Sequence, residues 1–192
     1  MDDLQRELAD PQLAVDLLST LRHNGDELED HLQDPERASA WLTAHFGPRL
    51  GRRLSERANV DDLVRFRDRL RTLFTAVVDG RAAPLTAIQA INEAAAEAPV
   101  TLAARRARDG TVRVERTHLD ATAVSVLRAE CARAALALLT DDLRDRLMLC
   151  RAPSCILFFL RQHPHQQWCS PSCGNRARVA RHYARHHHQQ SR

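Results

Sequence analysis

Hydrophobic positions recur every three or four residues along several stretches of the chain, which is the spacing of one face of an amphipathic helix. The clearest stretch begins after Asn59, which we expect to cap the helix, and ends at Gly80. Its apolar positions are Leu63, Phe66, Leu70, Leu73, Phe74 and Val77. The other stretches with helical spacing are residues 11–21, 35–45, 85–96 and 120–139. The pattern predicts a mainly helical body.

A different pattern, in which apolar and polar residues alternate, occupies residues 100–105 and 112–116, on either side of Asp109 and Gly110. An Asp-Gly pair favours a tight hairpin turn because glycine tolerates a positive φ angle. The sequence therefore predicts one small β-hairpin in the helical body. A further short helix is predicted over residues 141–148.

Charge is distributed unevenly along the chain. Residues 150–192 hold seven arginines, six histidines and no acidic residue, whereas residues 1–149 carry a net charge of −4. A basic end on an acidic body is typical of a segment that meets a polyanion, although a solubilising tail has the same charge. The N-terminus is acidic and polar, unlike a secretory signal, and no apolar run approaches the roughly 18 residues of a membrane span. We therefore expect a cytoplasmic protein without a membrane partner.

Four of the five cysteines lie within 24 residues, in the pattern C-x4-C-x13-C-x3-C: Cys150, Cys155, Cys169 and Cys173. Cysteine pairs at short spacing suit tetrahedral Zn²⁺, and the alternative, disulfide bonding, is disfavoured in the cytosol. Four protein ligands leave no open coordination position, so we predict one structural zinc ion and no catalytic one. The fifth cysteine, Cys131, falls on an apolar helical stripe and is predicted to be a buried core residue.

Residues beside the cysteines have predicted supporting roles. A strand over 156–159 would pack on the preceding helix, Trp168 would shield the metal from water, and Ser170 would cap a following helix. In that helix Arg176 faces the thiolates, and Asn175 is expected to have a similar capping or hydrogen-bonding role.

The outward face of the last helix is predicted to hold four basic side chains, Arg178, Arg181, Arg185 and His182. We expect Val179 and Tyr183, on the opposite face, to seat the helix on the metal fold. A ridge of arginines without acidic neighbours suits contact with phosphates, which predicts binding to DNA, although a solvated basic helix has the same composition. The closing histidines and the rest of 187–192 are expected to be disordered.

Several of these residues carry a family resemblance. Cys173-Gly174-Asn175-Arg176, preceded by Trp168-Cys169-Ser170 and by Cys150 and Cys155, resembles the CGNR zinc finger. The N-terminal part is similar to the ABATE domain that usually precedes this finger, and its matching segments are Asp16-Leu17-Leu18-Ser19-Thr20, Trp41-Leu42 and Ala90-Ile91-Asn92.

The resemblance implies a mainly α-helical N-terminal domain with a small β-hairpin, followed by a small C-terminal zinc finger with four cysteine ligands. It also implies a bacterial transcription regulator linked to stress response. We predict three parts: an ABATE-like domain over 1–145, the finger over 146–186, and a basic tail over 187–192.

Three functions compete at this point. The first is a DNA-binding regulator whose N-terminal domain takes a small-molecule or protein signal. The second is a protein-interaction or redox-sensing module in which thiolate oxidation releases zinc. The third is a metal-dependent nuclease using His163, His165, Asn175 and His182, which the lack of any carboxylate after Asp145 disfavours. The body contains no phosphate-binding glycine loop and no nucleophile elbow, so we expect the first function and not an enzyme.

Overall fold

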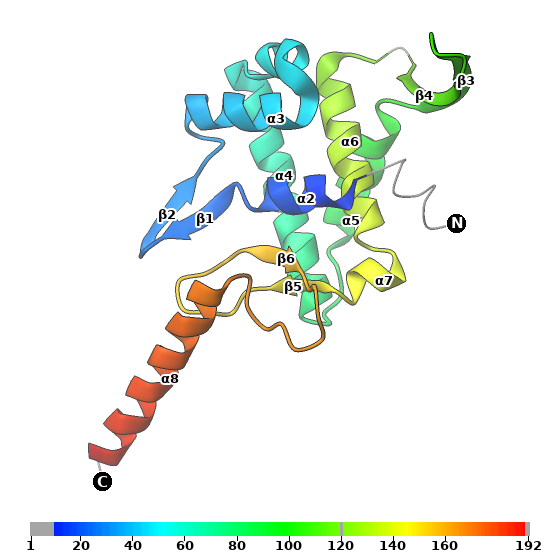
Figure 1. Cartoon of the computed structure of the whole chain (residues 1–192). Coiled ribbons are helices and arrows are strands. Elements are labelled where there is room, and N and C mark those ends of the chain that lie inside the picture. Colours follow the sequence, from blue (N-terminus) through cyan, green and yellow to red (C-terminus); the bar gives the residue numbers. More distant parts are fainter. Residues whose placement is uncertain (1–9, 120, 191–192) are drawn as a thin grey trace.

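The computed structural model describes residues 10–119 and 121–190 (Figure 1). Within them, helices predominate and the strands form three two-stranded antiparallel sheets, which confirms the predicted mainly α class. The elements in chain order are α2 (Pro11–Leu18), β1 (Leu21–Asn24), β2 (Glu27–Asp30), α3 (Pro35–Leu54), α4 (Arg57–Val78), α5 (Leu85–Ala96), β3 (Val100–Arg106), β4 (Val112–His118), α6 (Ala123–Ala137), α7 (Asp141–Arg144), β5 (Leu147–Leu149), β6 (Phe158–Leu160) and α8 (Pro171–Gln190). None of the described helices is long and apolar enough to cross a membrane.

Helix α4 runs through the middle of the body and supplies much of its core (Figure 1). Five of the apolar positions whose spacing predicted it are at most 3% exposed: Leu63, Phe66, Leu70, Leu73 and Phe74. The predicted cap was wrong, because the helix begins at Arg57 and Asn59 lies in its first turn. The backbone N–H of Asn59 donates to the carbonyl of Glu56 (3.0 Å), so helical hydrogen bonding has already begun there.

Helices α2, α5 and α6 surround α4. Helix α6 packs against α2, α4 and α5, and α4 in turn contacts α2 and α5. Cys131 of α6 is 0% exposed within this contact region, so the predicted core cysteine is confirmed. Burial raises the pKa of the Cys131 thiol above its usual range, which makes it an unreactive packing residue.

Two hairpins extend from the helical body. The predicted one is formed by β3 and β4, and Gly110 takes φ 84° in its turn. The other, between β1 and β2, replaces the end of the helix predicted over 11–21. The hydroxyls of Ser19 and Thr20 donate to carbonyls of the last turn of α2, and Gly25 takes φ 65° between the strands. Side-chain bonds of this kind compete with helical ones and favour ending the helix.

Two other helices differ in length from those predicted from the sequence. Helix α3 continues past the predicted residue 45 to Leu54, with a kink at Gly47 (φ 78°) and Pro48. The helix predicted over 141–148 ends at Arg144, and the chain then forms β5, which pairs with β6. Extended backbone at this position allows Leu147 to reach the main core, where it is 3% exposed.

The C-terminal segment is joined to the body through Arg71 of α4. Its guanidinium donates to the carbonyl of Leu18 in α2 (2.8 Å) and to that of Ile156 ahead of β6 (2.9 Å). The same group lies 5.3 Å from the ring centre of Phe158, whose ring also packs on Phe74. The strand predicted around 156–159 therefore packs on the body, and α8 extends away from it at the lower left of Figure 1.

Candidate metal centre

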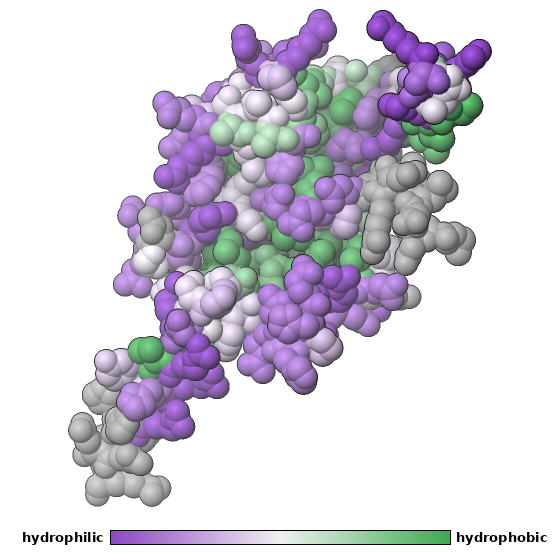
Figure 2. Space-filling view, viewed as in Figure 1, coloured by the Kyte–Doolittle hydropathy of each residue, from purple (hydrophilic) through white to green (hydrophobic). Residues whose placement is uncertain are grey.

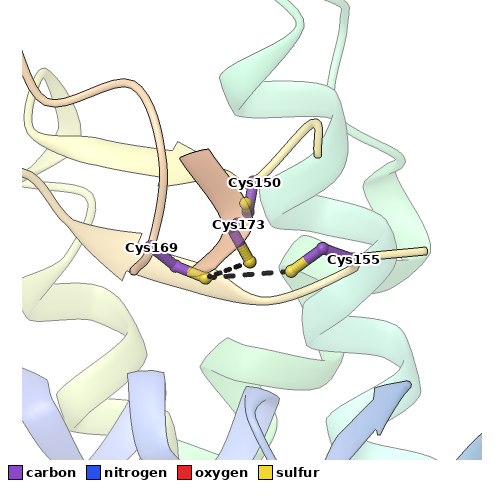
Figure 3. Close-up of side chains that lie close together, drawn as sticks. All are labelled: Cys150, Cys155, Cys169 and Cys173. Carbon is purple, nitrogen blue, oxygen red and sulfur yellow. Dashed lines mark hydrogen bonds between the residues drawn. The ribbon is translucent and has the colours of Figure 1, made fainter. Parts of the chain in front are cut away.

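The structure brings the four cysteines of the C-terminal segment to one point. Cys150 follows β5, Cys155 precedes β6, Cys169 precedes α8, and Cys173 lies in the first turn of α8. Their sulfur atoms all lie within 4.8 Å of one another, and the side chains converge from four directions (Figure 3). Among the described residues this is the one group of three or more histidine, cysteine or acidic side chains placed to hold a metal ion.

The distances between sulfur atoms match a tetrahedral metal site and not a disulfide. Cys155 Sγ lies 3.8 Å and Cys173 Sγ 3.5 Å from Cys169 Sγ. A zinc–sulfur bond of about 2.3 Å places the sulfurs of a tetrahedral site about 3.8 Å apart, whereas a disulfide bond is about 2.0 Å long. The donor set therefore fits one Zn²⁺ ion. Four sulfurs fill its coordination sphere, so the ion would fold the segment and would not bind a substrate.

The first cysteine pair is positioned by the β5–β6 hairpin and a tight loop. The backbone N–H of Cys150 donates to the carbonyl of Leu157 (2.9 Å), and that of Cys155 donates to Ala152 (3.0 Å). Ser154 turns the chain with φ 53°, a left-handed conformation that costs energy for a residue with a side chain. The loop between the two cysteines is therefore locally strained at Ser154, where the chain turns and brings Cys155 close to Cys150.

The second pair is positioned by the start of α8. The N–H of Cys173 donates to Ser170 Oγ (3.3 Å), and the N–H of Gly174 donates to the Ser170 carbonyl (3.1 Å). Ser170 thus caps the helix as its sequence position suggested, with Pro171 in the first turn. The positive end of the helix lies beside Cys173 and favours its thiolate.

Proton affinities differ within the cluster. Burial raises the pKa of Cys155 to about 11, and burial together with neighbouring cysteines raises that of Cys169. Burial also opposes the thiolate of Cys173, but hydrogen bonds from Ser170 and the other cysteines hold the pKa of Cys173 below its usual value. Metal binding displaces protons from these thiols, so affinity falls as pH falls.

Trp168 and Gly174 pack against each other beside the sulfurs. Trp168 is half-buried and lies against the small apolar cluster around the cysteines. A Cβ atom on Gly174 would lie 3.1 Å from Trp168 Cδ1, closer than ordinary van der Waals contact. Glycine suits this position, because a side chain here would require the indole ring to shift by a few tenths of an ångström.

Arg176 and Asn175 take different positions. Arg176 Nη2 donates to Cys173 Sγ (3.1 Å), so its positive charge offsets part of the negative charge of the thiolates. Asn175 is exposed, and its Oδ1 accepts a hydrogen bond from Arg178. The side chain of Asn175 is thus engaged on the outer surface of α8.

The residues that hold α8 on the metal fold differ from those predicted. Val179 is 53% exposed and Tyr183 is 62% exposed, so neither holds the helix on the metal fold. Ala177 and Cys173 do so, at 5% and 4% exposure, packed in a small cluster with Phe159. The prediction failed because α8 leaves the body after its second turn, and all of residues 178–185 are exposed.

The predicted basic face lies beyond the part of α8 that packs on the metal fold. Arg178, Arg181, His182 and Arg185 are all exposed on the projecting part of α8. Its helical backbone continues to Gln190, through 187–190 of the tail that was expected to be disordered, and residues 191–192 lie outside the described part of the chain. His163 and His165 are exposed in the loop ahead of Trp168.

A helical body joined to a four-cysteine metal centre defines the class of zinc-finger proteins. Two family models match the chain: ABATE, described as "Putative stress-induced transcription regulator", over residues 12–142, and the CGNR zinc finger over residues 146–186. The chain therefore belongs to the ABATE family and carries a CGNR zinc finger. No curated protein matches it in sequence.

Proposed function

We propose that the protein is a transcription regulator of the cytoplasm that binds DNA through α8, with zinc fixing the base of that helix. The observation that carries the proposal is the projecting half of α8, where three exposed arginines lie on a helix without acidic residues. The ABATE domain is then the part that takes a small-molecule or protein signal. This role requires no catalytic step, and the filled coordination sphere of the zinc site agrees with it.

The dimensions and charge of α8 suit a DNA duplex. A helix is about 10–12 Å wide with its side chains, close to the roughly 12 Å width of the major groove. From Arg178 to Arg185 the helix rises about 10 Å, so three guanidinium groups can follow successive phosphates. The Nε atoms of Arg181 and Arg185 donate to backbone carbonyls one turn earlier, which orients both side chains along the helix.

The test is binding of duplex DNA measured by fluorescence anisotropy across a salt series. Replacing Arg178, Arg181 and Arg185 together by alanine should weaken binding at least about tenfold and reduce the slope of log K against log salt by about 3, since each phosphate contact contributes close to one unit. The matched control replaces three arginines of α3 that are also exposed, Arg49, Arg52 and Arg53. Unchanged binding in the α8 variant, or an equal loss in the control, would contradict the proposal.

A second candidate is a protein-interaction or redox-sensing module, and the exposed pair Val179 and Tyr183 favours it. An apolar pair one turn apart on a projecting helix suits packing against a partner protein. Oxidation of the half-buried Cys155 and Cys169 would release zinc and loosen the helix. DNA binding that the replacement of Arg178, Arg181 and Arg185 leaves unchanged, together with zinc release by peroxide, would support this candidate in place of the first.

A further inference from the structure

The β3–β4 hairpin carries an apolar surface that the rest of the described chain leaves uncovered. Val112 is 73% exposed, Val114 67% and Leu102 49%. In the register of the hairpin these residues share one face, because Ala104 lies opposite Val114 and the side chains alternate along each strand. The space-filling view shows apolar surface next to charged side chains at this end of the molecule, at the upper right (Figure 2).

The outer edge of β4 has backbone groups available for pairing. The N–H of Ala107 donates to Thr111 (2.8 Å), and the N–H of Leu119 donates to Pro99 (2.9 Å). Hydrogen-bonded pairs alternate along an antiparallel ladder, so the odd-numbered residues of β4 bond to β3. The N–H and C=O groups of the even-numbered residues therefore point away from β3. Since the described sheet has only these two strands, that edge is open to another strand.

We propose that β4 pairs with β4 of a second copy of this chain, antiparallel about a two-fold axis at Val114. In that register Val114 lies opposite its own copy, and both residues have outward-facing backbone groups. Arg113 of each copy then lies opposite Glu115 of the other on the opposite face of the sheet. The edge is thus complementary to itself in both hydrogen bonds and charge.

The charges of the hairpin favour β4 over the other edge. Within one copy Arg105 lies directly opposite Arg113, and each has a carboxylate partner: Arg105 pairs with Glu115 (3.3 Å) and Arg113 with Asp109 (3.4 Å). In the dimer Arg113 gains a second carboxylate, Glu115 of the other copy. Pairing β3 with its own copy about Ala104 places Arg105 opposite Ala103 and gains no ion pair. The choice of β4 therefore rests on its alternation of arginine and glutamate.

The hairpin and α8 lie at opposite ends of the molecule (Figure 1). A dimer formed through β4 therefore leaves both copies of α8 exposed. The inference does not depend on what α8 binds, because the groups that form this contact all lie in the hairpin.

Crosslinking tests the register directly in the zinc-loaded full-length protein. Hydrogen-bonded antiparallel pairs have Cα atoms about 5.5 Å apart, within disulfide reach, so Val114→Cys should give a covalent dimer of twice the 21.7 kDa chain under mild oxidation. Val112→Cys is the matched control, since Val112 is similarly exposed but lies far from its own copy in this register. Crosslinking of Val112→Cys in preference to Val114→Cys, or of Ala104→Cys across the β3 edge, would overturn the proposal.

Exchanging the charges of Arg113 and Glu115 tests the pairing without introducing a disulfide bond. Arg113→Glu alone or Glu115→Arg alone sets like charges opposite each other and should raise the dimer Kd about tenfold in sedimentation equilibrium, whereas the double exchange should return it to near the wild-type value. Circular dichroism of each variant checks that the fold is kept. A wild-type chain that stays monomeric at every concentration, or a double variant no better than the singles, rejects the two-fold pairing.

Discussion

At the scale of single residues, Arg67 of α4 is the one charged side chain that is buried in the described part of the chain. Its side chain is 1% exposed and donates to both carboxylate oxygens of Asp30 (2.6 and 2.8 Å), to Thr20 Oγ1 (3.2 Å) and to Asp68. A buried charge is tolerated only when it is paired in this way. The hydrogen bonds of Arg67 connect α4 to the β1–β2 hairpin, so their loss should lower the stability of the whole body.

We predict that Asp30→Asn lowers the free energy of unfolding by about 2 kcal/mol at neutral pH, because Arg67 loses its charged partner. Burial opposes ionisation of Asp30, but the hydrogen bonds and charge of Arg67 hold the pKa of this carboxyl below its usual value. A depressed pKa stabilises the fold above the unfolded value of about 3.9 and ceases to do so as pH falls through the folded value. Urea unfolding at several pH values should therefore show a constant difference above pH about 5 that shrinks below about 4.

The control for that measurement is Asp68→Asn, which removes a carboxylate from the same arginine. Asp68 is 55% exposed, so the change should cost less than about 1 kcal/mol. Equal effects of the two substitutions would contradict the assignment of Asp30 as the principal partner.

At the scale of elements, the base of α8 contains one close contact. Gly174 lies against Trp168, and even a Cβ atom at this position requires the indole ring to shift by a few tenths of an ångström, so a larger side chain must move it further. Glycine inside a helix normally costs up to about 1 kcal/mol relative to alanine, so its presence here is explained by space and not by helix propensity.

Gly174→Val should weaken zinc binding about tenfold, because overpacking typically costs about 1–3 kcal/mol and the displaced Trp168 loosens the helix that carries Cys173. Competition with a zinc chelator measures the affinity, and tryptophan fluorescence reports the ring. Ala180→Val is the matched control, since residue 180 is exposed on the same helix. Wild-type affinity in the Gly174 variant would show that the ring can move at no cost.

At the scale of the whole molecule, the chain has two packed clusters of very different size. The main one includes α4, α6 and Phe158, whereas the cluster around the cysteines contains only five buried residues, Cys150, Ala152, Phe159, Cys173 and Ala177. So small a cluster cannot offset the conformational entropy of its loops, and structural zinc contributes on the order of 10 kcal/mol. The link through Arg71 joins the two parts but does not replace the metal.

Removal of zinc should therefore loosen one end of the protein and leave the other folded. Hydrogen exchange after chelation should show lost protection in residues 150–177 and near-native protection in α4, α5 and α6. Restoring zinc should reverse the change. Loss of protection throughout the body would mean that the finger is part of a single cooperative unit, and unchanged protection of residues 173–177 would mean that zinc is not what holds α8.

Local sequence was sufficient to locate the main helices, though not all of their ends, and to identify the metal ligands. The spacing of Leu63, Phe66 and Leu70 identified α4, because a helix that covers a core must repeat its apolar residues at that period. Four cysteines in two short-spaced pairs indicated their metal centre in the same way, since the chemistry of thiolates and zinc needs little from the rest of the fold. The Asp-Gly turn likewise located the β3–β4 hairpin, whose conformation is set by a few adjacent residues.

Tertiary structure decided the features that join distant segments. Nothing near Arg67 or Arg71 in the sequence shows that their partners come from α2, β2 and the segment before β6, and burial of a charge can be judged only when those segments meet. The exposure of Val179 and Tyr183 could not be predicted from the sequence either. The spacing of apolar residues shows which side chains share a face of a helix, but it does not show how far the helix extends beyond its neighbours. Sequence thus determined the main helices and the four sulfurs of this protein, while packing determined where several helices end and which side chains remain available to a partner.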